Sequence, residues 1–105
     1  MKIKVTTKHF RNSKGYQFNH ACPLALAVKE AIKDPSVRVR VAMCEVILTK
    51  NGVKVEYDVT IKWCGSQQVY GGKWEGKDID TMIKAAKADK KLRFPTIVLD
   101  LTKIN

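Results

Sequence analysis

Three stretches of this 105-residue chain combine cations with groups that can bind phosphate or a nucleobase. They are the segment from Arg11 to Cys22, the pattern "VRVRV" at 37–41 and the Gly-rich "YGGKWEGK" at 70–77. Guanidinium groups bind phosphate through paired, charge-assisted hydrogen bonds, and aromatic side chains stack on bases. The composition of these stretches therefore predicts contacts to an anionic, nucleotide-type ligand.

The first stretch is a polar loop that runs into an expected helix. Pro23 suits the first helical position, so the N–H groups that follow it would lack helical partners and could hold an anion. The alternative is that Cys22 or Asn19 caps the helix and that the loop packs on itself. The candidate residues are Arg11, Lys14, Tyr16, His20, Leu24 and Ala25, with Phe18 as a second aromatic surface.

The second stretch places two arginines at alternate positions of an expected strand. Arg38 and Arg40 would then project from one face, roughly 7 Å apart. That spacing suits neighbouring phosphates, because each planar guanidinium can bind phosphate with two hydrogen bonds. Solvated surface arginines would give the same pattern, so this alternative stays open.

The third stretch combines glycines, which permit close backbone approach, with cations and aromatic rings. Its spacing differs from that of a Walker A loop, and no Lys-Ser/Thr pair follows. A lid over a nucleotide and an ordinary long connection both fit this composition. The candidate binding residues are Tyr70, Lys73, Trp74 and Lys77.

The sequence offers little support for catalysis. His20 and Cys22 lie two residues apart, but no third residue is identified that would orient them. Cys22, Cys44 and Cys64 lack the spacing of a zinc site and are expected to be reduced thiols. We therefore expect no enzyme activity, no metal and no cofactor.

The charge of the chain narrows the class of partner. Twenty Lys and Arg residues against ten Asp and Glu residues leave a formal net charge of +10. Such an excess attracts polyanions and phosphorylated small molecules, although it also promotes solubility and unspecific binding. No apolar run approaches the roughly 20 residues that span a bilayer, and no signal peptide is evident, so a cytosolic protein is expected.

The hydrophobic pattern predicts the elements that must position these residues. Residues 2–7 alternate as a strand, residues 8–22 form the loop, and residues 23–33 show helical spacing. Residues 37–49 and 53–63 form a hairpin around Asn51-Gly52. After the Gly-rich loop at 65–77, Asp78 caps a second helix with Ile79, Met82, Ile83 and Ala86 on one stripe, and residues 94–101 form the last strand.

The hairpin has a predicted register and one conflict. A two-residue turn pairs Leu48 with Val55, Val46 with Tyr57, Cys44 with Val59 and Ala42 with Ile61, all on the apolar face. The same register would turn Arg38 and Arg40 inward. A bend near residues 42–43 resolves this conflict, because it sends both arginines to the surface and turns the neighbouring valines inward.

These elements predict one α+β domain over residues 1–105. Two amphipathic helices among half-buried strands favour a two-layer sandwich, with both helices on one face of a mainly antiparallel sheet. A ferredoxin-like arrangement is the simplest topology with this element order. The other face of the sheet would be exposed or would pack on a second copy, so a homo-oligomer is expected.

Two segments, "ACPLALAVKEAI" followed by "VRVRV" and the closing "DIDTMIKAAKADKKLRFPTIVLDL", resemble a family of small proteins encoded by tailed phages. Members begin with a Met-Lys-(Ile/Val)-x-Val strand, continue into a "CP(I/V/L)ALAL" helix and end with "PF.FEL". Residues 22–27 match the helix motif, whereas the hairpin and the Gly-rich loop are longer than in the family. The resemblance implies a phage protein in the host bacterial cytoplasm with a host-directed or accessory role, and small phage proteins of that kind often block host defence.

Together, these features predict a non-enzymatic protein that binds a phosphorylated nucleotide in a basic pocket and sequesters a host defence signal. A nucleic-acid-binding protein is one alternative, and an inhibitor that binds an acidic host protein is another. No membrane partner is expected.

Overall fold

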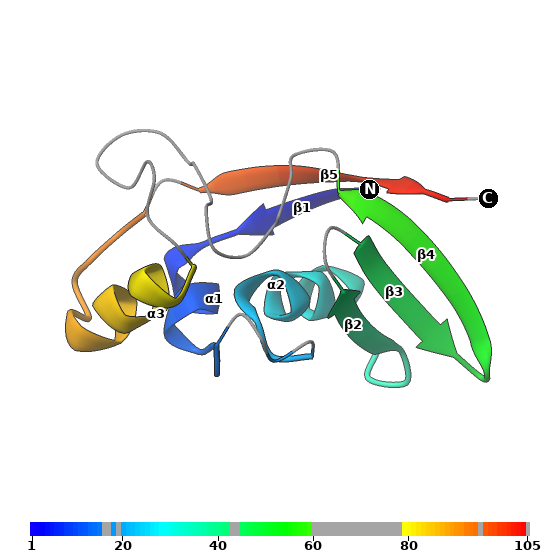
Figure 1. Cartoon of the computed structure of the whole chain (residues 1–105), viewed down its shortest axis with the longest axis horizontal. Coiled ribbons are helices and arrows are strands. Elements are labelled where there is room, and N and C mark those ends of the chain that lie inside the picture. Colours follow the sequence, from blue (N-terminus) through cyan, green and yellow to red (C-terminus); the bar gives the residue numbers. More distant parts are fainter. Residues whose placement is uncertain (16–17, 19, 43–44, 60–78, 95, 105) are drawn as a thin grey trace.

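A computed structural model describes residues 1–15, 18, 20–42, 45–59, 79–94 and 96–104. Its elements are β1 (Lys2–Val5), α1 (Thr7–Arg11), α2 (Pro23–Ile32), β2 (Arg38–Ala42), β3 (Glu45–Lys50), β4 (Val53–Val59), α3 (Ile79–Ala88) and β5 (Ile97–Lys103). The five strands form one antiparallel sheet, which curls around helix α2 (Figure 1). The expected two-layer α+β class is confirmed.

The strand order is β1-β5-β4-β3-β2, which differs from a ferredoxin-like sheet. In that fold the first strand lies inside the sheet, beside the last one. Here β5 takes the inner place, pairing Leu99 with Ile3 of β1 and Leu101 with Val59 of β4. Because β5 carries buried side chains toward the helices along its length, it is the strand best suited to an inner position.

The β3–β4 hairpin has the predicted turn and register. Asn51 and Gly52 both have positive φ, at 52° and 79°, as a two-residue hairpin turn of this type requires. Leu48 lies opposite Val55, and Val46 lies opposite Tyr57. The predicted pairing of Cys44 lies outside the described residues.

The predicted strand 37–49 is two strands, because the chain reverses direction between Ala42 and Glu45. β2 and β3 pair antiparallel, so Ala42 lies opposite Glu45 and not opposite Ile61 as expected. The reversal has the predicted effect on side chains: Val39 and Val41 are buried, whereas Arg38 and Arg40 are exposed. It also makes β2 an edge strand of the sheet.

Helix α1 occupies the start of the segment expected to be a loop. It has only five residues, too few to be stable alone, so tertiary packing must hold it. Its Phe10 is fully buried and meets Phe94 edge to face, with ring centroids 5.2 Å apart. This contact between residues distant in sequence is invisible to local pattern analysis.

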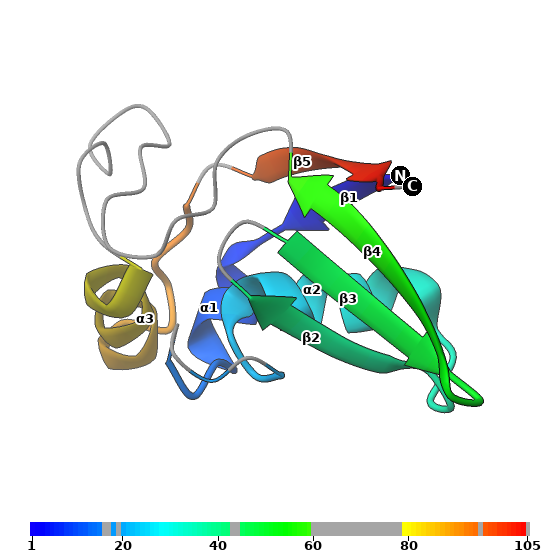
Figure 2. The same ribbon diagram turned by 45° about the vertical axis from the view of Figure 1, so that its right-hand side comes forward.

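The two longer helices follow their predicted stripes. In α3 all four predicted stripe residues are buried, and in α2 Leu24, Ala27 and Val28 are buried while Ala31 is exposed. Helix α2 lies against β1 and β2, whereas α1 and α3 pack together at one end of the sheet (Figure 2). None of the described helices has the length and apolar character needed to cross a membrane.

Candidate functional site

The start of α2, where we expected an anion site, is closed. The Ala25 N–H donates to Cys22 Sγ at 3.4 Å, and Leu24 and Ala25 have no exposed surface. Cys22 is therefore the cap, which is the alternative that the sequence left open. The helix dipole still favours negative charge here, but the atoms that would bind a ligand are buried and already engaged.

Burial also decides the chemistry of the capping thiol. Desolvation raises the pKa of Cys22 above its ordinary value of 9.0, although hydrogen bonds from the Ala25 and Leu24 N–H groups act in the opposite direction. The thiol is consequently neutral at physiological pH. A neutral, buried thiol acts as a small apolar group and a weak acceptor, not as a nucleophile.

Arg11, at the other end of the predicted loop, has a structural role. Its Nε donates to the Ala86 carbonyl at 2.8 Å, and its Nη2 donates to the carbonyls of Asp89 and Leu92 at 3.1 and 3.2 Å. These carbonyls lie at the C-terminal end of α3, where unpaired acceptors and the helix dipole attract a cation. The predicted phosphate contact of Arg11 is thus replaced by an internal one.

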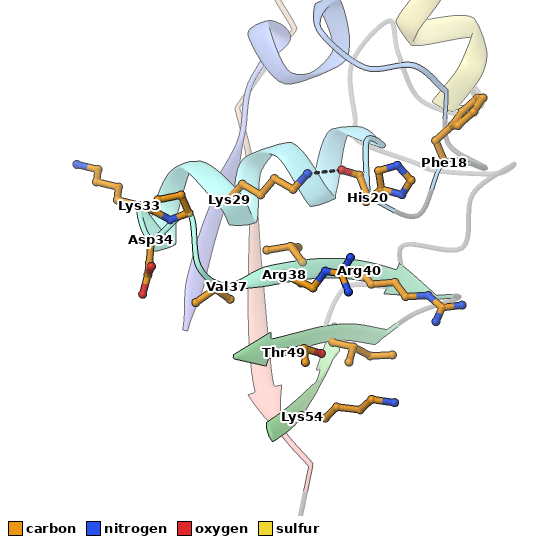
Figure 3. Close-up of a pocket in the computed structure, with 13 residues that line it drawn as sticks. Phe18, His20, Lys29, Lys33, Asp34, Val37, Arg38, Arg40, Thr49 and Lys54 are labelled. Carbon is orange, nitrogen blue, oxygen red and sulfur yellow. Dashed lines mark hydrogen bonds between the residues drawn. The ribbon is translucent and has the colours of Figure 1, made fainter. Parts of the chain in front are cut away.

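A groove between α2 and β2 gathers the basic side chains instead. This α2–β2 groove has a volume of about 1230 Å³ and continues around the edge strand onto the outer face of the β3–β4 hairpin (Figure 3). Arg38 and Arg40 lie along β2 between helix and hairpin. The basic residues that line the groove are His20, Lys29, Lys33, Arg38, Arg40 and Lys54.

The acidic residue of the groove is neutralised within the chain. Asp34 Oδ1 accepts hydrogen bonds from the side chain and the N–H of Ser36, and Asp34 Oδ2 lies 2.9 Å from Lys50 Nζ. These contacts, the Ser36 hydroxyl first, lower the pKa of Asp34 from 3.8 to about 2. The carboxylate is therefore charged and engaged, which leaves the groove with an excess of positive charge.

Lysine 29 connects the predicted loop to the helix wall of the groove. Its Nζ donates to the His20 carbonyl at 2.6 Å, and both residues are exposed (Figure 3). This bond holds the last turn of the loop against α2. A ligand phosphate beside Lys29 would share an ammonium group that is already positioned.

The structure brings only part of the predicted site together. His20, Arg38 and Arg40 share the groove, whereas Arg11, Lys14, Leu24 and Ala25 lie outside its lining. Sequence reasoning missed Lys29, Lys33 and Lys54, because lysines on exposed faces are usually solvated. The predicted contributions of Tyr16, Tyr70, Lys73, Trp74 and Lys77 lie outside the described residues.

One histidine–carboxylate pair was not predicted. His9 is buried and its Nε2 lies 3.0 Å from Glu30 Oε2, while its Nδ1 accepts the Thr6 N–H at 2.9 Å. Hydrogen bonds from Lys8 and then His9 lower the pKa of Glu30. Because both ring nitrogens are engaged, the pair has the geometry of a structural brace between α1 and α2 and not of a general base.

Metal chemistry has no obvious place in the described part of the chain. Within those residues, no group of three or more His, Cys, Asp or Glu side chains is arranged to hold a metal ion. What the α2–β2 groove can do is bind an anion by charge and hydrogen bonding.

Comparison with protein-family models, with curated proteins and with solved structures gave no match to this chain. The resemblance to tailed-phage proteins therefore stays a prediction, and the function must be argued from the groove.

Proposed function

We propose that this protein binds a phosphorylated nucleotide in the α2–β2 groove without transforming it. The observation that carries the proposal is that six basic residues, from a loop, helix α2 with its C-cap, and two strands, line one groove (Figure 3). Asp34, the acidic residue of the lining, is already engaged by Lys50 and Ser36. The net positive charge of the groove favours an anionic ligand.

The arrangement suits a ligand that carries more than one phosphate. Arg38 and Arg40 alternate along β2 on the same face, which separates their attachment points by roughly 7 Å. Arg38 could hold one phosphate with two hydrogen bonds, while Arg40, Lys29 and Lys33 add positive charge beside it. Phe18, 45% exposed in the groove lining, offers a ring on which a base could stack.

Calorimetry against cyclic dinucleotides, linear dinucleotides and ADP-ribose derivatives tests the proposal. We expect at least one of them to bind at micromolar concentration and an otherwise matched ligand without phosphate to fail. Absence of binding to all of them at tens of micromolar would contradict the proposal.

Charge-matched variants locate the binding. Arg38→Ala should weaken binding by about tenfold or more, since a charge-assisted hydrogen bond contributes about 1.5–3 kcal/mol. Lys84→Ala and Lys87→Ala are the controls, because both lysines are exposed on α3 and lie outside the groove lining. Equal weakening by all three variants would indicate unspecific attraction to a basic protein.

Salt dependence separates a nucleotide from a nucleic acid. Each phosphate contact in a nucleic-acid complex lowers log K by about 0.7 to 0.9 per decade of salt. A ligand with two or three phosphates in the groove should give a shallow slope. A slope that corresponds to many contacts would favour the nucleic-acid alternative.

The biological role that we propose rests on the resemblance to phage proteins. Inside an infected bacterium, binding of this kind would sequester a nucleotide defence signal in the host cytoplasm. Native mass spectrometry of the protein from infected cells should reveal the co-purifying ligand. A protein complex that survives nuclease treatment and removal of small molecules would favour the inhibitor alternative instead.

A further inference from the structure

On the outer face of β2, β3 and β4, opposite the helices, the two end rows of paired residues carry charges of opposite sign. Cross-strand pairing places Arg38, Thr49 and Lys54 in one row across β2, β3 and β4. Four residues further along β3, about 13 Å away, Glu45 lies directly opposite Asp58. The row between them holds the exposed Arg40, the half-buried Ile47 and the exposed Glu56, so the two end rows are basic and acidic while the middle row carries one charge of each sign.

The acidic end is unusual because no neighbouring cation compensates the negative charges of Glu45 and Asp58 among the described residues. Like charges directly opposite each other on neighbouring strands destabilise a sheet. Within the part of the chain that the structure describes, neither Glu45 nor Asp58 forms an ion pair. Asp58 is exposed and Glu45 partly so, which leaves both carboxylates accessible to a partner.

We propose that a second copy of this chain packs on the outer face of the sheet about a two-fold axis. The basic end of one copy, Arg38 and Lys54, then faces the acidic end of the other, Glu45 and Asp58. A two-fold axis makes both contacts at once, since each copy supplies the same two ends in opposite order. Ile47 and the exposed Val98 of β5 provide apolar surface on the same face.

Charge complementarity selects a second copy over other partners. A nucleic acid or an acidic protein would be attracted to Arg38 and Lys54 but repelled by Glu45 and Asp58. A uniformly basic partner would meet the opposite conflict. Only a partner with both charges in reversed order satisfies the two ends, and this chain is such a partner by symmetry.

The inference does not rest on the proposed nucleotide function. Arg38 and Lys54 belong to both surfaces, so a groove ligand would compete with the second copy. Glu45 and Asp58 lie outside the groove lining, and substituting them therefore separates the two ideas. Glu45→Lys with Asp58→Lys should weaken the dimer and retain nucleotide binding.

Sedimentation of two complementary double variants tests the dimer. The first carries Glu45→Lys and Asp58→Lys, and the second carries Arg38→Glu and Lys54→Glu. We expect the unmodified chain to dimerise at about 100 µM, and each variant alone to raise the dimer dissociation constant by at least about tenfold through like-charge repulsion. An equimolar mixture should dimerise again, because every reversed charge then meets an opposite one.

The control variant makes a charge change of the same size on α3, away from the outer face of the sheet. Lys84→Glu with Lys87→Glu makes the same charge change as the Arg38→Glu, Lys54→Glu variant, but on α3, and should leave dimerisation unchanged. A monomeric unmodified chain, or a mixture that stays monomeric, would overturn the proposal. If a variant fails to fold, a dilution series of the unmodified chain, followed by NMR, replaces it. The amide chemical shifts of Ile47 and Thr49 should change as the dimer dissociates. Chemical shifts that do not vary with protein concentration would reject the dimer.

Discussion

The N-terminus and the flank of helix α2 differ in whether their positive charge is accessible to a ligand. At its N-terminus the helix dipole favours an anion, yet Cys22 caps the helix and the surroundings are buried. Along its flank, basic side chains from three other segments join Lys29 and Lys33 around an open groove. A favourable local field becomes a binding site only where atoms remain accessible, and tertiary packing decides that.

The largest effect should come from the buried start of the helix. Leu24→Ala should lower the free energy of unfolding by about 2–5 kcal/mol, as is usual when a fully buried leucine is truncated. Nucleotide affinity of the folded protein should not change, because Leu24 lies outside the groove. Denaturant unfolding and calorimetry measure the two quantities.

Leu26 provides the matched control, since it is a leucine of the same helix that is only half-buried. Leu26→Ala should cost less than Leu24→Ala. If folded Leu24→Ala protein bound the nucleotide more weakly, the start of α2 would have to be counted as part of the binding site, and the contrast with the groove would not hold.

The next effect concerns Arg11, which the sequence assigned to the ligand. Arg11→Ala should lower the free energy of unfolding by about 1.5–3 kcal/mol, because the carbonyls at the end of α3 lose a charged donor. Arg93→Ala, which removes an exposed arginine bonded only to nearby carbonyls, should change it by less than about 0.5 kcal/mol. If Arg11→Ala weakened nucleotide binding without changing the free energy of unfolding, Arg11 would have to be assigned to the binding site.

A smaller effect should appear at alkaline pH through Cys22. Its pKa is raised in the folded protein, whereas the unfolded chain ionises near 9.0. The stability due to the neutral thiol is therefore present below pH 9 and decreases as the pH rises above it. Cys22→Ala should remove this alkaline component from unfolding curves recorded at several pH values.

Alkylation gives an independent readout of the same thiol. Peptide-resolved mass spectrometry should show Cys22 unmodified by iodoacetamide in native protein and modified after unfolding. Rapid labelling of Cys22 in the native protein would show that the helix start is open after all.

The smallest effect belongs to Asp34 at the rim of the groove. Its pKa is lowered to about 2 by Ser36 and Lys50, so its stabilising contribution is present above pH 3.8 and is lost as the pH falls toward 2. A carboxylate NMR titration should show this low midpoint, and Lys50→Ala should move it upward. An ordinary midpoint in the unmodified protein would mean that Asp34 is free to repel a ligand from the groove.

Much of the fold could be predicted from local pattern. The Asn51-Gly52 turn and the alternation of Val46 and Leu48 determine the β3–β4 register, because the side-chain period of a strand is two. Helical spacing identified the buried stripe of α3. By contrast, the five-residue helix α1 depends on Phe10 meeting Phe94, and a contact across more than eighty residues leaves no local signal.

The site was predicted only in part for a related reason. Alternation in "VRVRV" correctly placed both arginines on the surface, but it could not show that Lys29, Lys33 and Lys54 lie around them. The chain reversal between Ala42 and Glu45 makes β2 an edge strand, and this position beside α2 creates the groove.

The sequence by itself determined the chemistry available to this protein: a large cationic excess, a helix that begins at Pro23, a tight hairpin and a two-layer α+β architecture. The tertiary structure decided which cations act together. Arg11 bonds to carbonyls at the end of α3, and Cys22 caps and buries the start of α2. Six basic residues line the groove at the edge of the sheet. The physical reason is that charge is a property of single residues, whereas accessibility and proximity arise only when distant segments pack.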